Sequence, residues 1–184
     1  MVLTKTPICN FGEKTKSFEL KGIDDQLHKL EDHIGKNGLL IMFICNHCPY
    51  VKAIIRDIVE DCKNLKKEGV NSIAIMSNDT KEYPEDSFEN MKIFSKKFNF
   101  TFPYLIDETQ EIAKKYCAVC TPDFFGYNSK LELQYRGRIR ELKDLKPINT
   151  GESDLSKAMQ LIIKTGKGPK EQIPSMGCNI KWAK

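Results

Sequence analysis

A run of six apolar residues, Leu39–Ile44, followed at once by a C-x-x-C pair, Cys45 and Cys48, constrains the fold more than any other feature of this sequence. A continuous apolar run of this length is typical of a strand that is buried on both faces. From residue 51 onward, apolar residues recur at helical spacing as far as Leu65, with charged residues between them. Pro49 fits the first turn of that helix, because the N–H that proline lacks has no partner there. The sequence therefore predicts a buried strand that leads directly into a helix, with two cysteines at the junction.

This position favours cysteine reactivity. The nucleophile in thiol chemistry is the thiolate, and a helix N-terminus stabilises it through about half a positive charge and unpaired N–H groups. His47, which lies between the two cysteines, would lower a cysteine pKa further when protonated. Free cysteines are often simply buried small residues, but a strand, a C-x-x-C pair and a helix in this order are typical of a redox site. We therefore interpret Cys45 and Cys48 as a catalytic dithiol.

Length and composition limit the classes of protein to consider. The chain has 184 residues, of which 40% are hydrophobic and 29% charged, which predicts one globular α/β domain over 1–184. The net charge of +4 is small and the lysines are scattered, so we expect no nucleic-acid partner. No apolar run reaches the ~18 residues that a membrane span requires, so we expect no membrane partner either.

The cysteine content bears on the cellular compartment. Residues 1–18 contain no apolar stretch of the kind found in a secretory signal, and the seven cysteines are an odd number. A secreted scaffold held together by disulfides is therefore not expected, and reduced thiols in the cytoplasm fit better.

Local patterns predict the other elements. The expected segments are short strands and turns in an N-terminal extension over 1–37, a buried strand over 70–76, a helix over 87–98, a strand over 101–106, a helix starting at 107–109 and reaching 116, a hairpin of 123–127 with 131–136, a helix over 155–163 and an irregular tail over 166–184.

This order of elements resembles a thioredoxin fold over residues 39–165. Several sequence blocks further resemble peroxiredoxin-like, thioredoxin-family proteins of the alkyl-hydroperoxide-reductase/thiol-specific-antioxidant group. These blocks are Phe43–Lys52, Asn78–Asp79, Tyr83–Ser87, Phe102–Leu105, Cys120–Phe125, Tyr135–Arg138 and Gly177–Trp182. The resemblance implies a central mixed sheet flanked by helices, with an N-terminal β extension and a helical insertion over 84–106. It also implies an antioxidant or related redox role.

The resemblance also assigns roles to a second segment. It implies that Pro122 is a cis proline opposite the active-site cysteines, and that Thr121 and Pro122 form a loop that presents backbone groups to substrate. The same loop would bring Cys120 close to Cys45 and Cys48, although it is distant from them in sequence.

Two redox activities remain open. As a thiol–disulfide oxidoreductase, the chain would act on a disulfide in a protein or a small molecule and depend on a thiol reductant system. Resemblance to thioredoxins makes Cys45 the attacking thiol and Cys48 the resolving one. As a peroxidase, Cys48 would attack peroxide, and Cys45, Cys120 or Cys178 would resolve the sulfenic acid.

The sequence departs from the peroxiredoxin pattern Pro-x-x-x-Thr-x-x-Cys. Ile41 stands at the proline position and Cys45 at the threonine position, and no arginine directly precedes the strand after Pro122. Arg136 or Arg138 is a candidate to replace the missing peroxide-binding arginine. Each lost hydrogen bond to the transition state would cost roughly 2–4 kcal/mol, so we favour the oxidoreductase activity.

A third alternative is a non-enzymatic metal-binding protein. Cys45, His47 and Cys48, with Cys117 or Cys120, offer thiolate and imidazole ligands. The two C-x-x-C pairs are separated by 68 residues, far more than in a zinc ribbon. We therefore expect neither a metal nor another cofactor.

Overall fold

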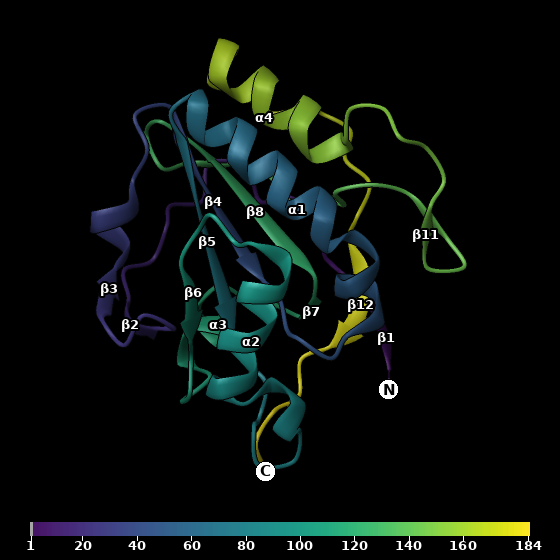
Figure 1. Ribbon diagram of the computed structural model, residues 1–184. Coiled ribbons are helices and arrows are strands. Elements are labelled where there is room, and N and C mark those ends of the chain that lie inside the picture. Colours follow the sequence, from purple (N-terminus) through teal and green to yellow (C-terminus); the bar gives the residue numbers. More distant parts are fainter. Residues whose placement is uncertain (1) are drawn as a thin grey trace.

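The computed structural model describes residues 2–184 and contains a central mixed sheet flanked by helices (Figure 1). The strands are β1 Leu3–Lys5, β2 Glu19–Gly22, β3 Leu27–Lys29, β4 Gly38–Phe43, β5 Val70–Met76, β6 Tyr104–Ile106, β7 Cys120–Thr121, β8 Asp123–Asn128, β9 Leu133–Tyr135, β10 Leu142–Lys143, β11 Lys146–Pro147 and β12 Met176–Asn179. The helices are α1 Pro49–Lys67, α2 Phe88–Phe98, α3 Glu111–Lys115 and α4 Asp154–Thr165, with 3₁₀ turns η1 Leu30–His33 and η2 Pro84–Asp86.

The sheet consists of two ladders that meet at neighbouring strands. One ladder has the order β3-β2-β6-β5 and the other the order β4-β8-β9. They meet where β4 lies beside β5, and there the Ile44 N–H donates to the Ile75 carbonyl at 3.0 Å. The β5–β6 pair is parallel and the other named pairs in these ladders are antiparallel. The mixed sheet that the resemblance implied is therefore confirmed.

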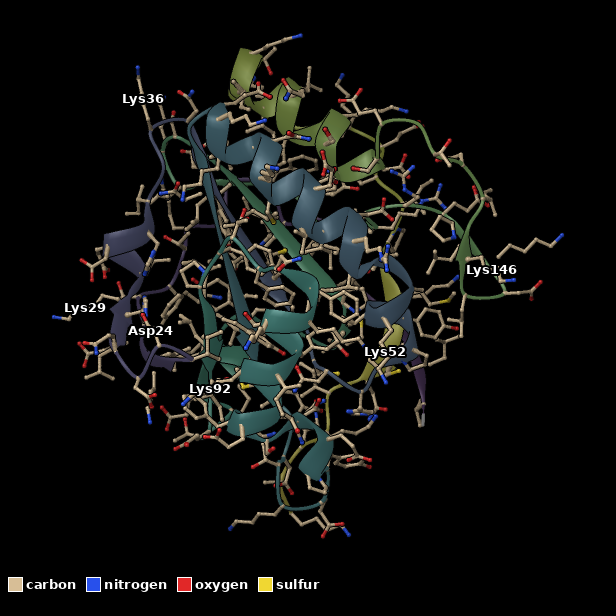
Figure 2. All side chains as sticks on the ribbon, in the orientation of Figure 1. Asp24, Lys29, Lys36, Lys52, Lys92 and Lys146 are labelled. Atoms are coloured by element: carbon tan, nitrogen blue, oxygen red, sulfur yellow. The ribbon has the colours of Figure 1, made fainter. Side chains whose placement is uncertain are left out.

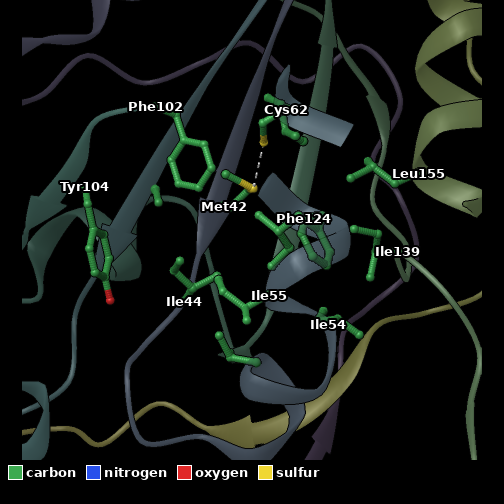
Figure 3. Close-up of a cluster of buried hydrophobic side chains, with 14 of the residues drawn as sticks. Met42, Ile44, Ile54, Ile55, Cys62, Phe102, Tyr104, Phe124, Ile139 and Leu155 are labelled. Atoms are coloured by element: carbon green, nitrogen blue, oxygen red, sulfur yellow. Dashed lines mark hydrogen bonds between the residues drawn. The ribbon is translucent and has the colours of Figure 1, made fainter. Parts of the chain in front are cut away.

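Strand β4 is buried on both faces, as its apolar run predicts. All six residues from Gly38 to Phe43 are buried. Because side chains alternate along a strand, Leu40 and Met42 contribute to one hydrophobic cluster and Leu39 and Ile41 to the other. Figure 3 shows Met42 and Ile44 of the first cluster facing side chains of α1, such as Ile54 and Ile55.

Helix α1 packs its apolar side on this cluster and ends near Gly69, as expected. Its buried residues recur at helical spacing: Val51, Ile54, Ile55, Ile58, Cys62 and Leu65. Gly69 has φ 82°, a left-handed conformation that glycine adopts without a Cβ penalty. The strand–helix–strand unit over 39–76 is thus confirmed, and it fixes where Cys45 and Cys48 lie.

The prediction of an irregular tail over 166–184 is wrong for residues 176–179. These form β12, which pairs antiparallel with β1 on one side and with β7 on the other. In Figure 1, β12 (yellow) runs beside β1 and past the N-terminal end of α1. The sequence did not predict this strand, because glycine at position 177 is unfavourable in a strand interior. A Cβ there would lie 2.0 Å from the Thr121 carbonyl oxygen, so the glycine marks a close approach of two backbones.

Two other boundaries and one strand pair differ from prediction. Helix α3 begins at Glu111 rather than at 107–109, because the Asp107 carboxylate accepts the N–H groups of residues 112 and 113 and Gln110 has φ 61°. Strand β6 covers only 104–106 of the expected 101–106. The loop before α4 contains an antiparallel pair, β10 with β11, that was not expected.

Many lysine side chains lie on the outside of the molecule. In Figure 2, the labelled Lys29, Lys36 and Lys146 project outward from different parts of the chain, in agreement with the scattered lysines of the sequence. Within residues 2–184, no helix is both long and apolar enough to span a bilayer.

Candidate active site

The strand–helix junction places Cys48 at the N-terminus of α1. Cys48 is the residue that precedes the first helical turn, and Pro49 occupies the first position, as predicted. Cys45 lies three residues earlier, beyond the end of β4. Neither cysteine has exposed surface. Within residues 2–184, all seven cysteines are free thiols in the structure.

The loop around Pro122 closes over the two cysteines. The Thr121–Pro122 peptide bond is cis, as the resemblance implied. The Thr121 hydroxyl lies 3.3 Å from the Cys45 Sγ, and the Thr121 carbonyl oxygen lies 3.1 Å from the Cys48 Sγ. One residue of this loop therefore contacts both thiols.

Cys48 has the environment of a stabilised thiolate. Its Sγ lies 2.9 Å from the Cys178 Sγ, which β12 brings to the site. The thiol of Cys45 beside Cys48 lowers the pKa of Cys48 most; burial opposes this, while the Cys178 thiol and the backbone N–H groups of Val51 and Cys178 lower it further. Together they bring the pKa of Cys48 from 9.0 to about 5. The Val51 N–H belongs to the first turn of α1, where such donors lack a helical partner.

Cys45 has the opposite environment. Burial raises its pKa well above 9.0, and the hydrogen bond with Cys48 and the nearby Asp86 carboxylate add to this. The Thr121 hydroxyl lowers it, but less. The pKa values of the two cysteines are therefore shifted in opposite directions, downward at Cys48 and upward at Cys45.

Asp86 organises the segment between the cysteines. Its side chain is completely buried and accepts the backbone N–H groups of Asn46 at 2.7 Å and His47 at 3.1 Å. It also accepts from His47 Nδ1 at 2.6 Å and from the Asn78 amide at 2.8 Å. Burial alone would raise the pKa of Asp86, but the hydrogen bonds from His47 and Asn78 lower it. The hydrogen bond between Asp86 and His47 in turn raises the pKa of His47.

Sequence reasoning did not find Asp86. It belongs to a Tyr-Pro-Glu-Asp segment that was interpreted only as a loop and as part of a family block. No local pattern shows that this carboxylate points at the cysteines 40 residues earlier. The one available signal was an acidic residue in a segment rich in turn residues.

Hydrogen bonds connect the Asp86 network to the C-terminal segment. The Asn78 side chain donates to Asp86 and accepts the Lys181 N–H at 2.9 Å. The Lys181 carbonyl accepts from the Asp79 N–H at 2.8 Å and from the Gln110 amide at 2.7 Å. The segment after β12 is thus fixed to the same loops that hold the dithiol.

The other predicted site residues make different contacts, although the charges of Cys48 and Cys178 still act on Cys120. Cys120 is buried on β7, where its thiol donates to the Pro122 carbonyl at 3.6 Å, and burial raises its pKa. Arg138 forms ion pairs with Asp154 at 2.7 Å and Glu141 at 3.4 Å.

Arg136 lies in a buried ion pair with Asp123 at 2.9 Å. Within residues 2–184, the structure shows no hydrogen bond from an arginine guanidinium to the Cys45 or Cys48 thiol.

The candidate metal ligands differ from those that the sequence suggested. Within residues 2–184, Cys45, His47 and Asp86 are the one group whose ligand atoms all lie within 4.8 Å of one another. Cys117, one of the suggested ligands, is exposed and not in this group. The His47 and Asp86 atoms of the group are already hydrogen-bonded to each other. The donor set therefore fits a structural His–Asp pair better than a metal centre.

Comparison with known proteins agrees with this geometry. The chain has the thioredoxin-like fold of thiol-dependent redox proteins. The family model described as AhpC/TSA family matches residues 11–142, so the chain belongs to the AhpC/TSA family. No match was found among curated proteins.

Three of the solved structures that are similar to the chain illustrate the range of the matches. An uncharacterized conserved protein from Geobacillus kaustophilus is 38% identical with a TM-score of 0.93, and the match covers 100% of this chain and 97% of that one. A hypothetical protein from Sinorhizobium meliloti 1021 is 33% identical with a TM-score of 0.89, covering 97% of each. A secreted Mycobacterium tuberculosis disulfide oxidoreductase homologous to E. coli DsbE shares the fold at 15% identity and a TM-score of 0.56, covering 68% of this chain and 87% of that one.

Proposed function

We propose that this protein is a thiol–disulfide oxidoreductase in which Cys48 is the nucleophile. The observation that carries this proposal is the position of Cys48 at the N-terminus of α1, with thiols of Cys45 and Cys178 beside it. A pKa of about 5 leaves Cys48 ionised at neutral pH. Membership of the AhpC/TSA family supports thiol chemistry in general.

The reaction begins with the Cys48 thiolate attacking one sulfur of a substrate disulfide. The substrate S–S bond breaks, a mixed disulfide forms on Cys48, and the other substrate sulfur leaves as a thiolate. A second protein thiol then loses its proton, attacks the Cys48 Sγ and releases the remaining substrate thiolate. A thiol reductant system returns the resulting protein disulfide to the dithiol.

This assignment reverses the one made by resemblance to thioredoxins, in which Cys45 attacks. A thiolate at Cys45 would lie beside the buried Asp86 carboxylate, and like charges close together disfavour ionisation. The Asp86–His47 pair has a positioning role, because it holds the backbone of the segment between the cysteines.

Peroxidase activity is the second candidate, since a Cys48 thiolate also suits attack on peroxide. The ion pairs of the two candidate arginines argue against peroxidase activity. Arg136 is paired with Asp123 and Arg138 with Asp154, so neither guanidinium is available beside Cys48 in this structure. Without a cation the developing charge on the peroxide oxygen would lack a strong hydrogen-bond donor.

Turnover of a small disulfide by the whole protein tests the proposal. The assay uses glutathione disulfide as substrate and dithiothreitol as reductant, and the wild type should turn over. The turnover rate of Cys48→Ser should be at least about 10³-fold lower, because a hydroxyl cannot replace the thiolate. Cys117→Ser, which removes an exposed thiol, is the matched control and should retain full activity. Equal turnover by Cys48→Ser and wild type would contradict the proposal, and faster reduction of hydrogen peroxide than of disulfide would favour the peroxidase.

A further inference from the structure

The C-terminal strand carries a cysteine into contact with the nucleophile. Cys178 lies 130 residues after Cys48 in the sequence, yet their Sγ atoms are 2.9 Å apart. Cys178 is almost completely buried, with 1% of its surface exposed. This thiol–thiol contact therefore lies in the interior and not at a loose chain end.

Backbone pairing on both sides fixes this position. In the strand register, Cys178 lies opposite Leu3 of β1 and opposite Thr121 of β7. Gly177 permits the approach, because any Cβ there would collide with the Thr121 carbonyl. Before the strand, the Ser175 hydroxyl donates to the Pro122 carbonyl at 2.8 Å. Cys178 is thus placed against Cys48 by the same loop that contacts the C-x-x-C pair.

The charges around Cys45 and Cys178 decide which thiol ionises more readily after the first step. Once Cys48 is in a mixed disulfide, its negative charge is gone and no longer opposes ionisation of either neighbour. The Asp86 carboxylate still opposes a thiolate at Cys45. Burial raises the pKa of Cys178 to about 12, and the Lys181 ammonium is a nearby charge that lowers it. The 2.9 Å contact thus places the Cys178 sulfur to attack Cys48, whereas a thiolate at Cys45 would face the Asp86 carboxylate.

We infer that Cys178 is the resolving thiol and that the redox couple is Cys48–Cys178 rather than Cys45–Cys48, an inference that rests on the proposed function. In the resolving step, Cys178 gives its proton to solvent and its sulfur attacks the Cys48 Sγ. The mixed-disulfide bond breaks, the substrate leaves as a thiolate, and a Cys48–Cys178 disulfide forms. The substrate disulfide is reduced by two electrons and the two protein thiols are oxidised by two; a dithiol reductant then reverses the oxidation.

Both thiols are buried, so a substrate reaches Cys48 only when a segment that lies against it moves, and β12, which carries Cys178, is one such segment. The resolving step then requires β12 to pair again with β7, which returns Cys178 to its position.

Disulfide mapping after oxidation tests this inference. The whole reduced protein is treated with one equivalent of glutathione disulfide, blocked with an alkylating reagent, digested and analysed by mass spectrometry. Wild type and Cys45→Ser should both contain a peptide pair joined through Cys48 and Cys178. Cys178→Ser should accumulate the Cys48–glutathione adduct, with resolution at least tenfold slower than in wild type. Cys117→Ser is the control for removal of one thiol.

The alternative outcomes separate the two proposals. A Cys45–Cys48 disulfide in wild type, together with unchanged resolution in Cys178→Ser, would overturn the role of Cys178 and leave the proposed function standing. No glutathione adduct and no disulfide in the folded wild type would overturn both. Should Cys178→Ser not fold, mapping in wild type and Cys45→Ser still decides the pairing, and Cys178→Ala provides a second variant.

Discussion

At the scale of single residues, the difference between Cys48 and its neighbours is the property that can be measured most directly. The Cys45 thiol, the Cys178 thiol and two backbone N–H groups lower the pKa of Cys48 to about 5, whereas burial raises the pKa of Cys45. The first prediction concerns this titration. The thiolate ultraviolet absorbance of the reduced protein should rise as the pH increases through about 5, and Cys48→Ser should lack this step.

Cys178→Ala should shift the same step to higher pH, because one S–H donor to the thiolate is lost. Cys62→Ala is the matched control, since Cys62 is also buried but lies on α1 beside Met42, with its Sγ 3.9 Å from that sulfur. A step that survives in Cys48→Ser would assign the thiolate to another cysteine.

Asp86 gives the second prediction. Asp86→Asn keeps the shape of the side chain but removes the charge that His47 and two backbone N–H groups contact. The variant should lower the pKa of His47, measured by NMR titration, and reduce the free energy of unfolding by about 1.5–3 kcal/mol. Glu85→Gln, at the exposed neighbouring position, should change neither quantity.

The pH dependence of this loss has a defined sign. The raised pKa of His47 stabilises the fold below 6.5, and this contribution is lost as the pH rises through the folded-state pKa. The lowered pKa of Asp86 stabilises the fold above 3.8, and that contribution is lost as the pH falls. The difference in free energy of unfolding between wild type and Asp86→Asn should therefore be largest between about pH 4 and 6.5. A difference that grows above pH 8 would contradict this prediction.

At the scale of elements, the predictions from sequence succeeded where one local pattern decided the structure. The apolar run of β4 and the helical spacing of α1 each specify an element without reference to distant residues. Strand β12 could not be found in this way. Its four residues, Met-Gly-Cys-Asn, lack an alternating pattern, and they form a strand only because β1 and β7 lie on either side.

The third prediction concerns β12. Gly177→Ala would place a Cβ 2.0 Å from the Thr121 carbonyl, so the strand should pair less well with β7. If pairing weakens by about 1.4 kcal/mol, the population with β12 detached rises about tenfold. Reaction of Cys48 with a soluble disulfide reagent should accelerate by a similar factor, measured by stopped flow.

Gly151→Ala is the matched control for this change. An added Cβ at Gly151 meets no atom within 4 Å, so the rate should stay at the wild-type value. An unchanged rate in Gly177→Ala would show that β12 does not limit access to Cys48.

At the scale of the whole molecule, the candidate site combines segments that are far apart in the sequence. The C-x-x-C pair and its helix were predictable, because residues 39–65 carry both patterns. Asp86, Thr121 and Cys178 join the site only through the tertiary fold. The resemblance to known families supplied Thr121 and suggested Cys178, but neither periodicity nor spacing predicts that Cys178 contacts Cys48.

The last prediction concerns the contact between the two helices on one side of the sheet. The Ser153 hydroxyl, which caps α4, donates to the Asp61 carboxylate of α1 at 2.5 Å. Burial raises the pKa of Asp61 from 3.8 to about 6. Since the folded state binds its proton more tightly than the unfolded state, ionisation of Asp61 destabilises the fold as the pH rises from 3.8 to about 6, and the cost is constant above that.

Asp61→Asn keeps an oxygen to accept from Ser153 and removes the buried charge. The variant should therefore be more stable than wild type by about 1–2 kcal/mol at pH 7.5 and about equal to it at pH 4, as measured by urea unfolding at both values. Glu60→Gln, the exposed neighbour on α1, should show no such pH-dependent gain. A loss of stability in Asp61→Asn at pH 7.5 would mean that the ionised carboxylate contributes more through its hydrogen bond to Ser153 than its burial costs. The contact between α1 and α4 would then be stabilised by the negative charge of Asp61.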